Sequence, residues 1–445
     1  MNPLRSLPKI DKLLDNHIFK DCNPALLAPL VKNAVKDVRK DILSGKATSY
    51  EEAALLDEIL KTYLKILSPS LVPLINATGV IVHTNLGRSC LSHTLFERAK
   101  KTLSGYTNLE YDLEKGCRGE RYAHVSYHLK ALLGVEDVLV VNNNAAAVFL
   151  ILNTFAPNKE SIVSRGELVE IGGSFRVPDV MARSGTQLIE VGTTNKTRID
   201  DYEAAINENT ALLMKVHRSN FSIEGFSEEA SMEEITLLAK KKGLLDYYDL
   251  GSGYIDTLPY GLSYAEPSLL RILAKSPSLV SFSGDKLLGG VQAGIIVGNK
   301  KLIKRLKSNQ LLRMLRVDKL TLSLLEETTK AYLANETNLI PTLFLLNRSV
   351  TDLELIATHL QKQIGIEKCN IIHSQTFVGG GTLPNRPIPT VALQIEGDAK
   401  TLERQFRQEG LIGRIESDFF LLDLRALLPE SEDELIKCCK RVLGC

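Results

Sequence analysis

A lysine in a glycine-rich turn after an apolar run is the residue of this sequence best placed for chemistry. The strand-forming run 278–282 leads into Ser283, Asp285 and Lys286, and two glycines follow at 289–290. Desolvation at such a position lowers the pKa of an ammonium group and frees the amine to form a Schiff base. Ser283 could contact a phosphate in the same small site. Taken alone, the pattern is equally typical of a strand-end lysine without a chemical role.

Polar residues also follow two other apolar runs. Asp249 ends one of them, about 37 residues before Lys286, and Leu-Gly-Ser-Gly comes next. A carboxylate at such a position needs a partner, and in pyridoxal phosphate enzymes an aspartate pairs with the protonated ring nitrogen of the cofactor. Asn142–Asn144 follow the run 138–141 and open a helix whose free N–H groups can hold an anion. This turn is neither G-x-G-x-x-G nor a Walker loop, so it does not imply a nucleotide.

Each of these patterns alone is also typical of an ordinary turn or helix cap. Their order along the chain, an amide-rich turn, then an aspartate, then Ser-x-x-Lys, fits the aminotransferase-like fold and predicts a pyridoxal phosphate site. The residues expected to hold the cofactor are Lys286, Asp249, Asn143, Asn144 and Ser283.

Several arginines are a second group of candidate functional residues. Arg313 and Arg316 are spaced i, i+3, which predicts that they share one face of a helix. Guanidinium groups bind phosphate-like oxyanions through two parallel hydrogen bonds. For any single arginine, a surface or interface salt bridge is the simpler interpretation. The arginines in motif-like surroundings are Arg88, Arg118, Arg121, Arg313 and Arg316.

The middle of the chain alternates apolar runs with helical patterns. Most of the runs are continuous rather than alternating, as in strands buried on both faces of a parallel sheet. Ligands of such sheets bind at the carboxyl ends of the strands. His217 follows one run, and its role stays open. The expected strands are 138–141, 161–164, 187–191, 212–216, 244–249, 279–282 and 294–297, with helices at 232–242, 300–308 and 319–336.

The two ends of the chain have a different pattern of apolar residues from the middle. Residues 10–19, 25–43 and 50–67 have helical periodicity, and Ser49 and Glu52 are spaced as a capping box. After residue 341 we expect a helix at 352–363, a strand at 390–395, a helix at 400–409, a short β pair at 413–422 and a helix at 432–443. The expected organisation is a helical domain (1–66), a linker (67–75), a mostly parallel α/β core (76–340) and a small α/β domain (341–445).

Composition is that of a globular protein of two or three domains. The 445 residues carry 54 Lys+Arg against 53 Asp+Glu, a net charge of +1, so a nucleic-acid surface would have to be a local basic patch. The seven cysteines show no zinc-like spacing and fit reduced thiols. No window approaches a membrane span, and the N-terminus has no apolar signal region. We therefore expect a cytoplasmic protein without a metal.

Several longer motifs carry a resemblance to the bacterial selenocysteine synthases, the L-seryl-tRNA(Sec) selenium transferases. It covers the whole chain, and the motifs are specific to that family rather than to pyridoxal phosphate enzymes in general. They are N-A-T-G-V-I-V-H-T-N-L-G-R (76–88), N-L-E-Y-D-L-E-K-G-C-R-G-E-R-Y (108–122), V-N-N-N-A-A-A-V (141–148), G-E-L-V-E-I-G-G-S-F-R-V-P-D-V (166–180), E-V-G-T-T-N-K-T (190–197), D-L-G-S-G (249–253), S-G-D-K-L-L-G-G (283–290) and L-R-V-D-K-L-T (315–321).

The resemblance implies an enzyme of the fold-type I pyridoxal phosphate class, with the cofactor on Lys286. It would convert L-seryl-tRNA(Sec) to L-selenocysteinyl-tRNA(Sec) with selenophosphate, through an aminoacrylyl-tRNA intermediate. Asp285 falls on a catalytic position, and Arg88, Arg313 and Arg316 fall on positions used for catalysis and the selenium donor. The charges of residues 1–66 alone indicate a solvated helix face, but the resemblance makes this the tRNA(Sec)-binding domain. It also implies a homodecamer, a pentamer of dimers.

The sequence departs from the family pattern at two places. Val291 stands where a proline is expected after the double glycine, which would alter the rigidity of the turn. Arg218 and Glu224 are charged in a segment that is usually less so, close to the expected cofactor site.

Two other classes of protein remain as alternatives. One is a pyridoxal phosphate β-lyase or transferase acting on a small amino acid without tRNA, which would not need residues 1–66. The other is a tRNA-binding protein that has lost catalysis. The presence of Asp249, Asp285 and Lys286 together argues against the second.

Overall fold

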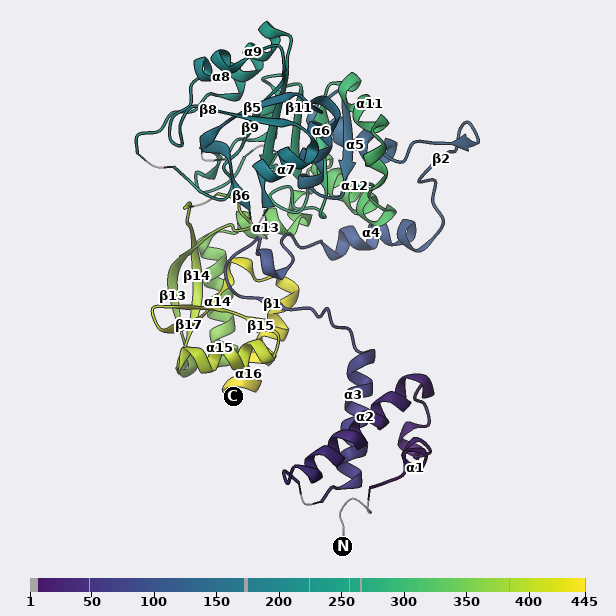
Figure 1. Cartoon of the computed structure of the whole chain (residues 1–445). Coiled ribbons are helices and arrows are strands. Elements are labelled where there is room, and N and C mark those ends of the chain that lie inside the picture. Colours follow the sequence, from purple (N-terminus) through teal and green to yellow (C-terminus); the bar gives the residue numbers. More distant parts are fainter. Residues whose placement is uncertain are drawn as a thin grey trace. The chain divides into compact units, whose positions relative to one another are not determined.

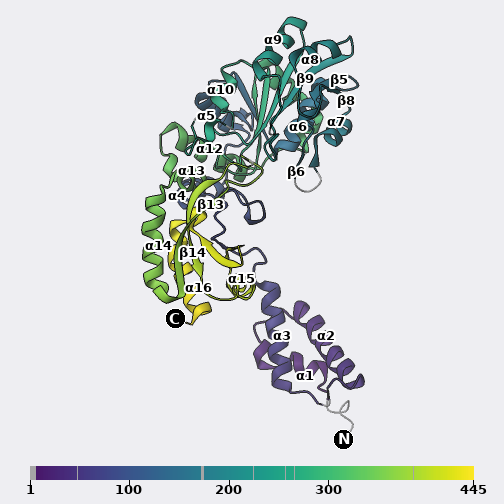
Figure 2. The same cartoon turned by 90° about the vertical axis from the view of Figure 1, so that its left-hand side faces the viewer.

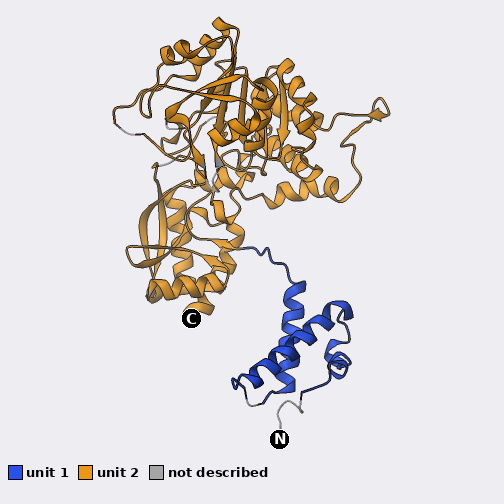
Figure 3. Ribbon diagram, in the orientation of Figure 1, with its two compact units in different colours: residues 1–73 blue, residues 74–445 orange. Residues whose placement is uncertain are grey.

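The chain forms two compact units, residues 1–73 and residues 74–445 (Figure 3). The computed structural model describes residues 7–47, 49–171, 175–223, 225–255, 257–264, 266–383 and 385–444, so Glu224 lies outside the described residues. No helix in these ranges is long and apolar enough to cross a membrane.

The first unit is helical. Its elements are α1 (Ile10–Leu14), η2 (His17–Phe19), α2 (Pro24–Leu43) and α3 (Glu52–Leu67). Apolar residues on one face of each element, among them Leu13, Val31 and Ile59, form a small core. The capping box expected at Ser49 is wrong: Glu51 is the N-cap of α3, and the Glu51 side chain makes no capping hydrogen bond.

A seven-stranded sheet forms the centre of the second unit (Figure 1). Only β12 (Gly294–Gly298) runs antiparallel to its neighbours, so the expected mostly parallel α/β sheet is confirmed. All seven strands were expected from their apolar runs, and all except β8 are buried at most of their residues. The order across the sheet is β4 (Asp137–Val141), β12 (Gly294–Gly298), β11 (Leu279–Ser283), β10 (Leu245–Gly251), β9 (Thr210–Val216), β5 (Glu160–Ser164) and β8 (Gln187–Val191).

Helices cover both faces of this sheet. Figure 2 shows α6 (Asn144–Phe155) and α7 (Val177–Ser184) on one side and α5 (Ala123–Leu133), α10 (Leu269–Leu273) and α12 (Lys319–Leu333) on the other. The helices of this part are α4 (His93–Ser104), α5 (Ala123–Leu133), α6 (Asn144–Phe155), α7 (Val177–Ser184), α8 (Ile199–Ala205), α9 (Met232–Lys242), α10 (Leu269–Leu273), α11 (Lys300–Ser308) and α12 (Lys319–Leu333). Two short antiparallel pairs, β2 (Tyr111–Asp112) with β3 (Cys117–Arg118) and β6 (Glu170–Ile171) with β7 (Phe175–Arg176), lie outside the sheet.

An antiparallel four-stranded sheet follows, in the order β13 (Cys369–Thr376), β14 (Ile388–Ile395), β17 (Phe419–Asp423) and β16 (Arg414–Glu416). Its helices are α13 (Pro341–Asn347), α14 (Val350–Ile364), α15 (Ala399–Gln408) and α16 (Glu432–Leu443). The expected elements are present, and β13 is an additional strand that the sequence reading missed.

The start of the second unit joins this C-terminal sheet region. β1 (Ile75–Asn76) pairs in parallel with β15 (Leu411–Ile412). A Cβ at Gly79 would lie 2.4 Å from the buried carboxyl of Asp423, so the chain can pass this close only as glycine. Residues near 76 and near 423 therefore fold together, and the boundary expected at 340/341 lies inside one compact unit.

Candidate active site

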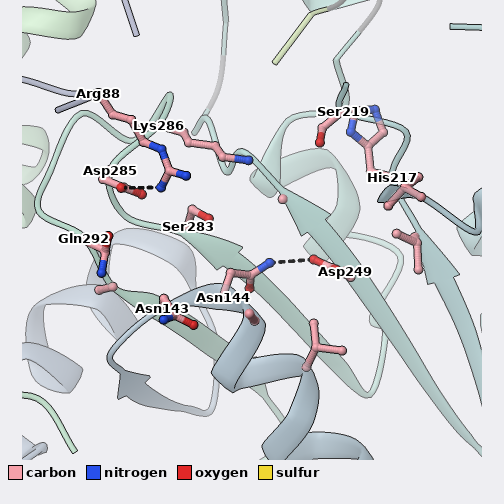
Figure 4. A pocket seen from close by; sticks show the side chains of 16 residues that line it. Arg88, Asn143, Asn144, His217, Ser219, Asp249, Ser283, Asp285, Lys286 and Gln292 are labelled. Carbon is pink, nitrogen blue, oxygen red and sulfur yellow. Dashed lines mark hydrogen bonds and ion pairs between the residues drawn. The ribbon is translucent and has the colours of Figure 1, made fainter. Parts of the chain in front are cut away.

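A cavity of about 220 Å³ opens at the carboxyl edge of the central sheet (Figure 4). The ends of β4, β9, β10 and β11 converge there, as expected for a ligand site in a parallel sheet. Seven of the nine residues predicted from the cofactor and donor motifs line the cavity, and the other two are Arg313 and Arg316. His217 is a further lining residue. The seven are Arg88, Asn143, Asn144, Asp249, Ser283, Asp285 and Lys286.

Lys286 is held in the cavity by a turn that requires glycine. The backbone N–H of Gly284 donates to Ala293 O at 2.9 Å, and a Cβ at Gly284 would lie 2.4 Å from Val291 O. Lys286 is only 5% exposed. Burial lowers the pKa of its ammonium group, and the nearby Arg88 cation lowers it further, although three carboxylates oppose the shift. A neutral, nucleophilic amine is therefore easier to reach here than at the surface.

Asp249 and Asn144 form a buried acceptor pair. Asn144 Nδ2 donates to Asp249 Oδ1 at 2.7 Å (Figure 4). Burial raises the pKa of Asp249 to about 6, while the hydrogen bond from Asn144 and the Lys286 charge pull it down. Asn144 Oδ1 is also buried and has no hydrogen-bond partner among the described residues. The oxygens of this pair can therefore accept hydrogen bonds from an N–H or O–H group of a ligand.

The N-terminus of α6 lies on another side of the cavity. Asn143 is its N-cap and accepts from the backbone N–H of Ala146 at 2.8 Å. β12 passes directly behind this turn, since a Cβ at Gly294 would lie 2.1 Å from Asn143 O. The free N–H groups and the dipole of a twelve-residue helix favour an anion here, and Ser283 adds a hydroxyl to the same cavity.

Arg88 reaches the cavity from a segment far away in the sequence. Its Nη1 lies 2.8 Å from Asp285 Oδ2, and its backbone is left-handed with φ 63°. The next residue fixes this segment, because Ser89 Oγ donates to Lys286 O at 2.7 Å. The guanidinium is thus held beside the amine and retains N–H groups for an anionic ligand.

Arg313 and Arg316 are not among the residues that line this cavity. The expectation that they share a helix face is wrong, because the 3-10 helix η6 (Gln310–Arg313) ends at the first of them. The chain then turns so that Leu315 O accepts from the backbone N–H of Asn142 at 3.1 Å. Arg313 is exposed, and Arg316 lies 3.4 Å from Glu110.

The other motif arginines are close to the same carboxylate. Arg121 lies 2.8 Å and Arg118 lies 3.1 Å from Glu110. Arg121 Nη1 also donates to Val317 O at 2.7 Å, which fixes the segment after η6. Arg218, one of the two unusual charges, pairs with Glu229 at 2.8 Å.

Sequence reasoning missed Glu266, which is 1% exposed behind the cavity. Ser252 donates to its Oε1, while its Oε2 has no hydrogen-bond partner in the described structure. His217 Nδ1 lies 3.7 Å from Glu266 Oε1. Burial raises the pKa of Glu266 to about 7 and lowers the pKa of His217 to about 4. Both groups are thereby shifted toward their neutral forms. Glu266 precedes no motif and follows no strand, so no local signal marked it.

Comparisons with known proteins agree with this geometry. The chain is 54% identical to the L-seryl-tRNA(Sec) selenium transferase of Sulfurimonas denitrificans, over 99% of both chains. It is also 54% identical to that of Aliarcobacter butzleri, over 99% of this chain and 97% of that protein. A solved D-glucosaminate-6-phosphate ammonia-lyase shares the fold, with a TM-score of 0.61 and 18% identity over 86% of this chain and 99% of that chain. The L-seryl-tRNA selenium transferase profile matches residues 74–428, and the chain belongs to this family.

Proposed function

We propose that this protein converts L-seryl-tRNA(Sec) to L-selenocysteinyl-tRNA(Sec), using pyridoxal phosphate as cofactor and selenophosphate as selenium donor. The observation that carries the proposal is the meeting of Lys286, Asp249 and the α6 N-terminus in one cavity of a chain from this family. The full-length relatives named for this reaction support the substrate.

The residues present fit the cofactor. A buried lysine with a lowered pKa suits its aldehyde, and the acceptors Asp249 and Asn144 suit its protonated ring nitrogen and polar ring substituents. The α6 N-terminus with Ser283 suits its phosphate. When bound, pyridoxal phosphate supplies an electron sink for the electrons released at the serine α-carbon.

The side chains of the chain itself supply the remaining roles. The neutral Lys286 amine is the base for the serine α-proton, since burial disfavours its charged form. Arg88 binds the oxygens of selenophosphate, because its guanidinium matches an oxyanion. Asp285 positions Arg88 through their 2.8 Å ion pair.

We infer further that the first unit binds tRNA(Sec) and that the protein acts in the cytoplasm as a homo-oligomer, with the decamer of the family as the expected assembly. Support for self-association comes from the segment around β2 and β3, where Tyr106 is fully exposed and Leu113 is 74% exposed. Arg313 and Arg316 would then serve the donor in the cavity of a neighbouring copy.

The test is the visible absorbance of the cofactor-loaded protein, titrated separately with seryl-tRNA(Sec), uncharged tRNA(Sec) and free serine. We expect a spectral change with the charged tRNA alone, and selenocysteinyl-tRNA after addition of selenophosphate. Lys286→Ala should lose both the cofactor absorbance and the product. A change with free serine and none with charged tRNA would instead support a lyase of small amino acids.

A further inference from the structure

Helix α11 has an unusual charge content for a chain whose net charge is +1. Its nine residues, KKLIKRLKS, include five basic and no acidic side chains. Lys307 is neutralised by Glu120 at 2.8 Å and Asp137 at 3.1 Å. Lys301, Lys304 and Arg305 are exposed and form no ion pair within the described part of the chain. Their charges are therefore available to an external partner.

These three cations line a groove between α11 and α6, which we call the α11 groove. Lys301, Lys304, Arg305 and Ser308 are spaced i, i+3, i+4 and i+7, so they share one helix face. The groove is shallow and wide open to solvent, with a volume of about 490 Å³, and no carboxylate is among its described lining residues. Its walls are completed by Asn153, Thr154 and Asn309.

The groove is ordered by contacts that leave its cations facing outward. Asn309 Nδ2 donates to Asn153 Oδ1 at 3.0 Å and to Thr154 Oγ1 at 2.8 Å, which ties the end of α11 to α6. The Arg305 guanidinium lies over the Phe155 ring, 4.6 Å from its centroid. A stacked guanidinium keeps its N–H edges free for oxyanions.

The buried apolar side chains of α11 do not belong to its cationic face. The opposite face of α11 carries Ile303 and Leu306, both fully buried in the central core. Like charges at i, i+3 and i+4 destabilise an isolated helix, so the basic face opposes helix formation until an anion binds. No large apolar side chain on α11 is exposed, which argues against a membrane surface. The charge pattern instead fits a phosphate backbone.

The α11 groove is also connected to the active site. Helix α6 begins at Asn144 in the cavity and reaches Asn153 in the groove, a rise of about 14 Å along the helix. The chain that leaves α11 returns to the cavity edge, where Leu315 O accepts from Asn142 N–H. The α11 groove therefore lies within reach of a polyanion whose reacting end enters the cavity.

We propose that the α11 groove binds backbone phosphates of the tRNA substrate, so that the catalytic unit itself contributes to RNA affinity. The inference rests on the proposed function, since it takes the RNA to be the substrate. Lys301 and Lys304 each neutralise a phosphate, and Arg305 adds a third, sequence-independent contact.

The test compares two full-length double variants, K301Q/K304Q in the groove and K400Q/R404Q on α15. Lys400 and Arg404 are also exposed on one helix, at i and i+4, and form no ion pair with described residues. The dissociation constant of seryl-tRNA(Sec) is measured by fluorescence anisotropy at several KCl concentrations. For K301Q/K304Q we expect weaker binding and a log–log salt slope smaller by about 2, about 1 for each lysine. The control variant should match the wild type.

Three further readouts keep the result interpretable. Circular dichroism and cofactor absorbance should be unchanged in K301Q/K304Q, because neither lysine touches the core or the cavity. Unchanged affinity and salt slope, or an equal loss in K400Q/R404Q, would overturn the proposal. A change of assembly mass by light scattering with unaltered RNA affinity would overturn it in favour of an interface between copies. If wild-type protein does not bind seryl-tRNA(Sec), the proposed function fails together with the inference.

Discussion

Replacing Asp249 by asparagine is expected to stabilise the cofactor-free protein, and more at pH 8 than at pH 5. Burial raises the pKa of Asp249 from its ordinary 3.8 to about 6, so its ionisation costs folding free energy that an amide of the same shape avoids. The amide oxygen can still accept from Asn144 Nδ2.

The magnitude follows from the difference between the two pKa values of Asp249. Because its folded-state pKa lies above its unfolded value, the stability linked to this group is fully present below pH 3.8 and falls as the pH rises to about 6. The shift of about 2 pH units corresponds to about 3 kcal/mol in total. About 1.4 kcal/mol of this is lost between pH 5 and pH 8. The asparagine variant should not show that loss.

Urea unfolding of the apoprotein at both pH values measures the effect. The chain contains no tryptophan, so near-ultraviolet circular dichroism of tyrosines is the natural signal. Tyr247 and Tyr248 are buried in β10 and report the unit that carries the site. The difference in unfolding free energy between the variant and the wild type should be about 1.4 kcal/mol larger at pH 8 than at pH 5.

Asp246→Asn provides a matched control with the opposite sign. Asp246 lies three residues earlier on the same strand and accepts from Thr236 Oγ1 at 2.7 Å and from Ser278 Oγ at 2.5 Å. An amide there replaces one acceptor by a donor, so it should destabilise the protein at both pH values. The reasoning about Asp249 would be refuted by a gain of equal size at pH 5 and pH 8, or by a loss at pH 8.

Three further substitutions test the rest of the site. Gly294→Ala places a Cβ 2.1 Å from Asn143 O, so the turn at the start of α6 must move; equilibrium dialysis should find at least about tenfold weaker binding of pyridoxal phosphate. Arg88→Lys keeps the charge but loses the two-pronged contact with an oxyanion; the KM for selenophosphate should rise about tenfold or more while cofactor absorbance stays unchanged, and an unaltered KM would remove Arg88 from donor binding. Glu266→Gln removes a carboxyl whose pKa burial raises from 4.5 to about 7. The unfolding free energy of the wild-type apoprotein should fall by about 3 kcal/mol between pH 4.5 and pH 7 because of this group, and the variant should not show that fall. An unchanged pH profile of urea unfolding in the variant would contradict the shift.

Local sequence patterns predicted the central sheet and most of the cavity for one physical reason. Strands buried on both faces must be apolar throughout, so a polar residue directly after such a run lies at the sheet edge. Asn144 and Lys286 each lie three residues past the end of their strands, β4 and β11, and Asp249 lies near the carboxyl end of β10. Parallel strands then bring together residues that are far apart in the chain. The cavity was therefore predictable before any long-range contact was known.

The features that were missed depend on contacts between distant segments. β13 has exposed and half-buried residues along most of its length, as an edge strand does, and therefore carries no continuous apolar run. The pairing of Ile75 with Leu411 joins residues more than 300 positions apart and leaves no local trace. Arg316 lies outside the expected helix because the chain turns to place Leu315 O against Asn142 N–H. The spacing of residues in the sequence alone cannot predict such a tertiary contact.

The cavity and its immediate surroundings hold buried ionisable groups whose pKa shifts all favour the neutral form. Burial lowers the pKa values of Lys286 and His217 and raises those of Asp249 and Glu266, so each group moves toward its neutral form. A fold selected for stability alone would gain from apolar residues of similar volume at these positions. A neutral amine and protonatable carboxyls are, however, what proton transfer near neutral pH requires. Asp249→Asn should therefore be more stable and less active than the wild type, and a variant that gained stability without losing turnover would contradict a catalytic purpose for this burial.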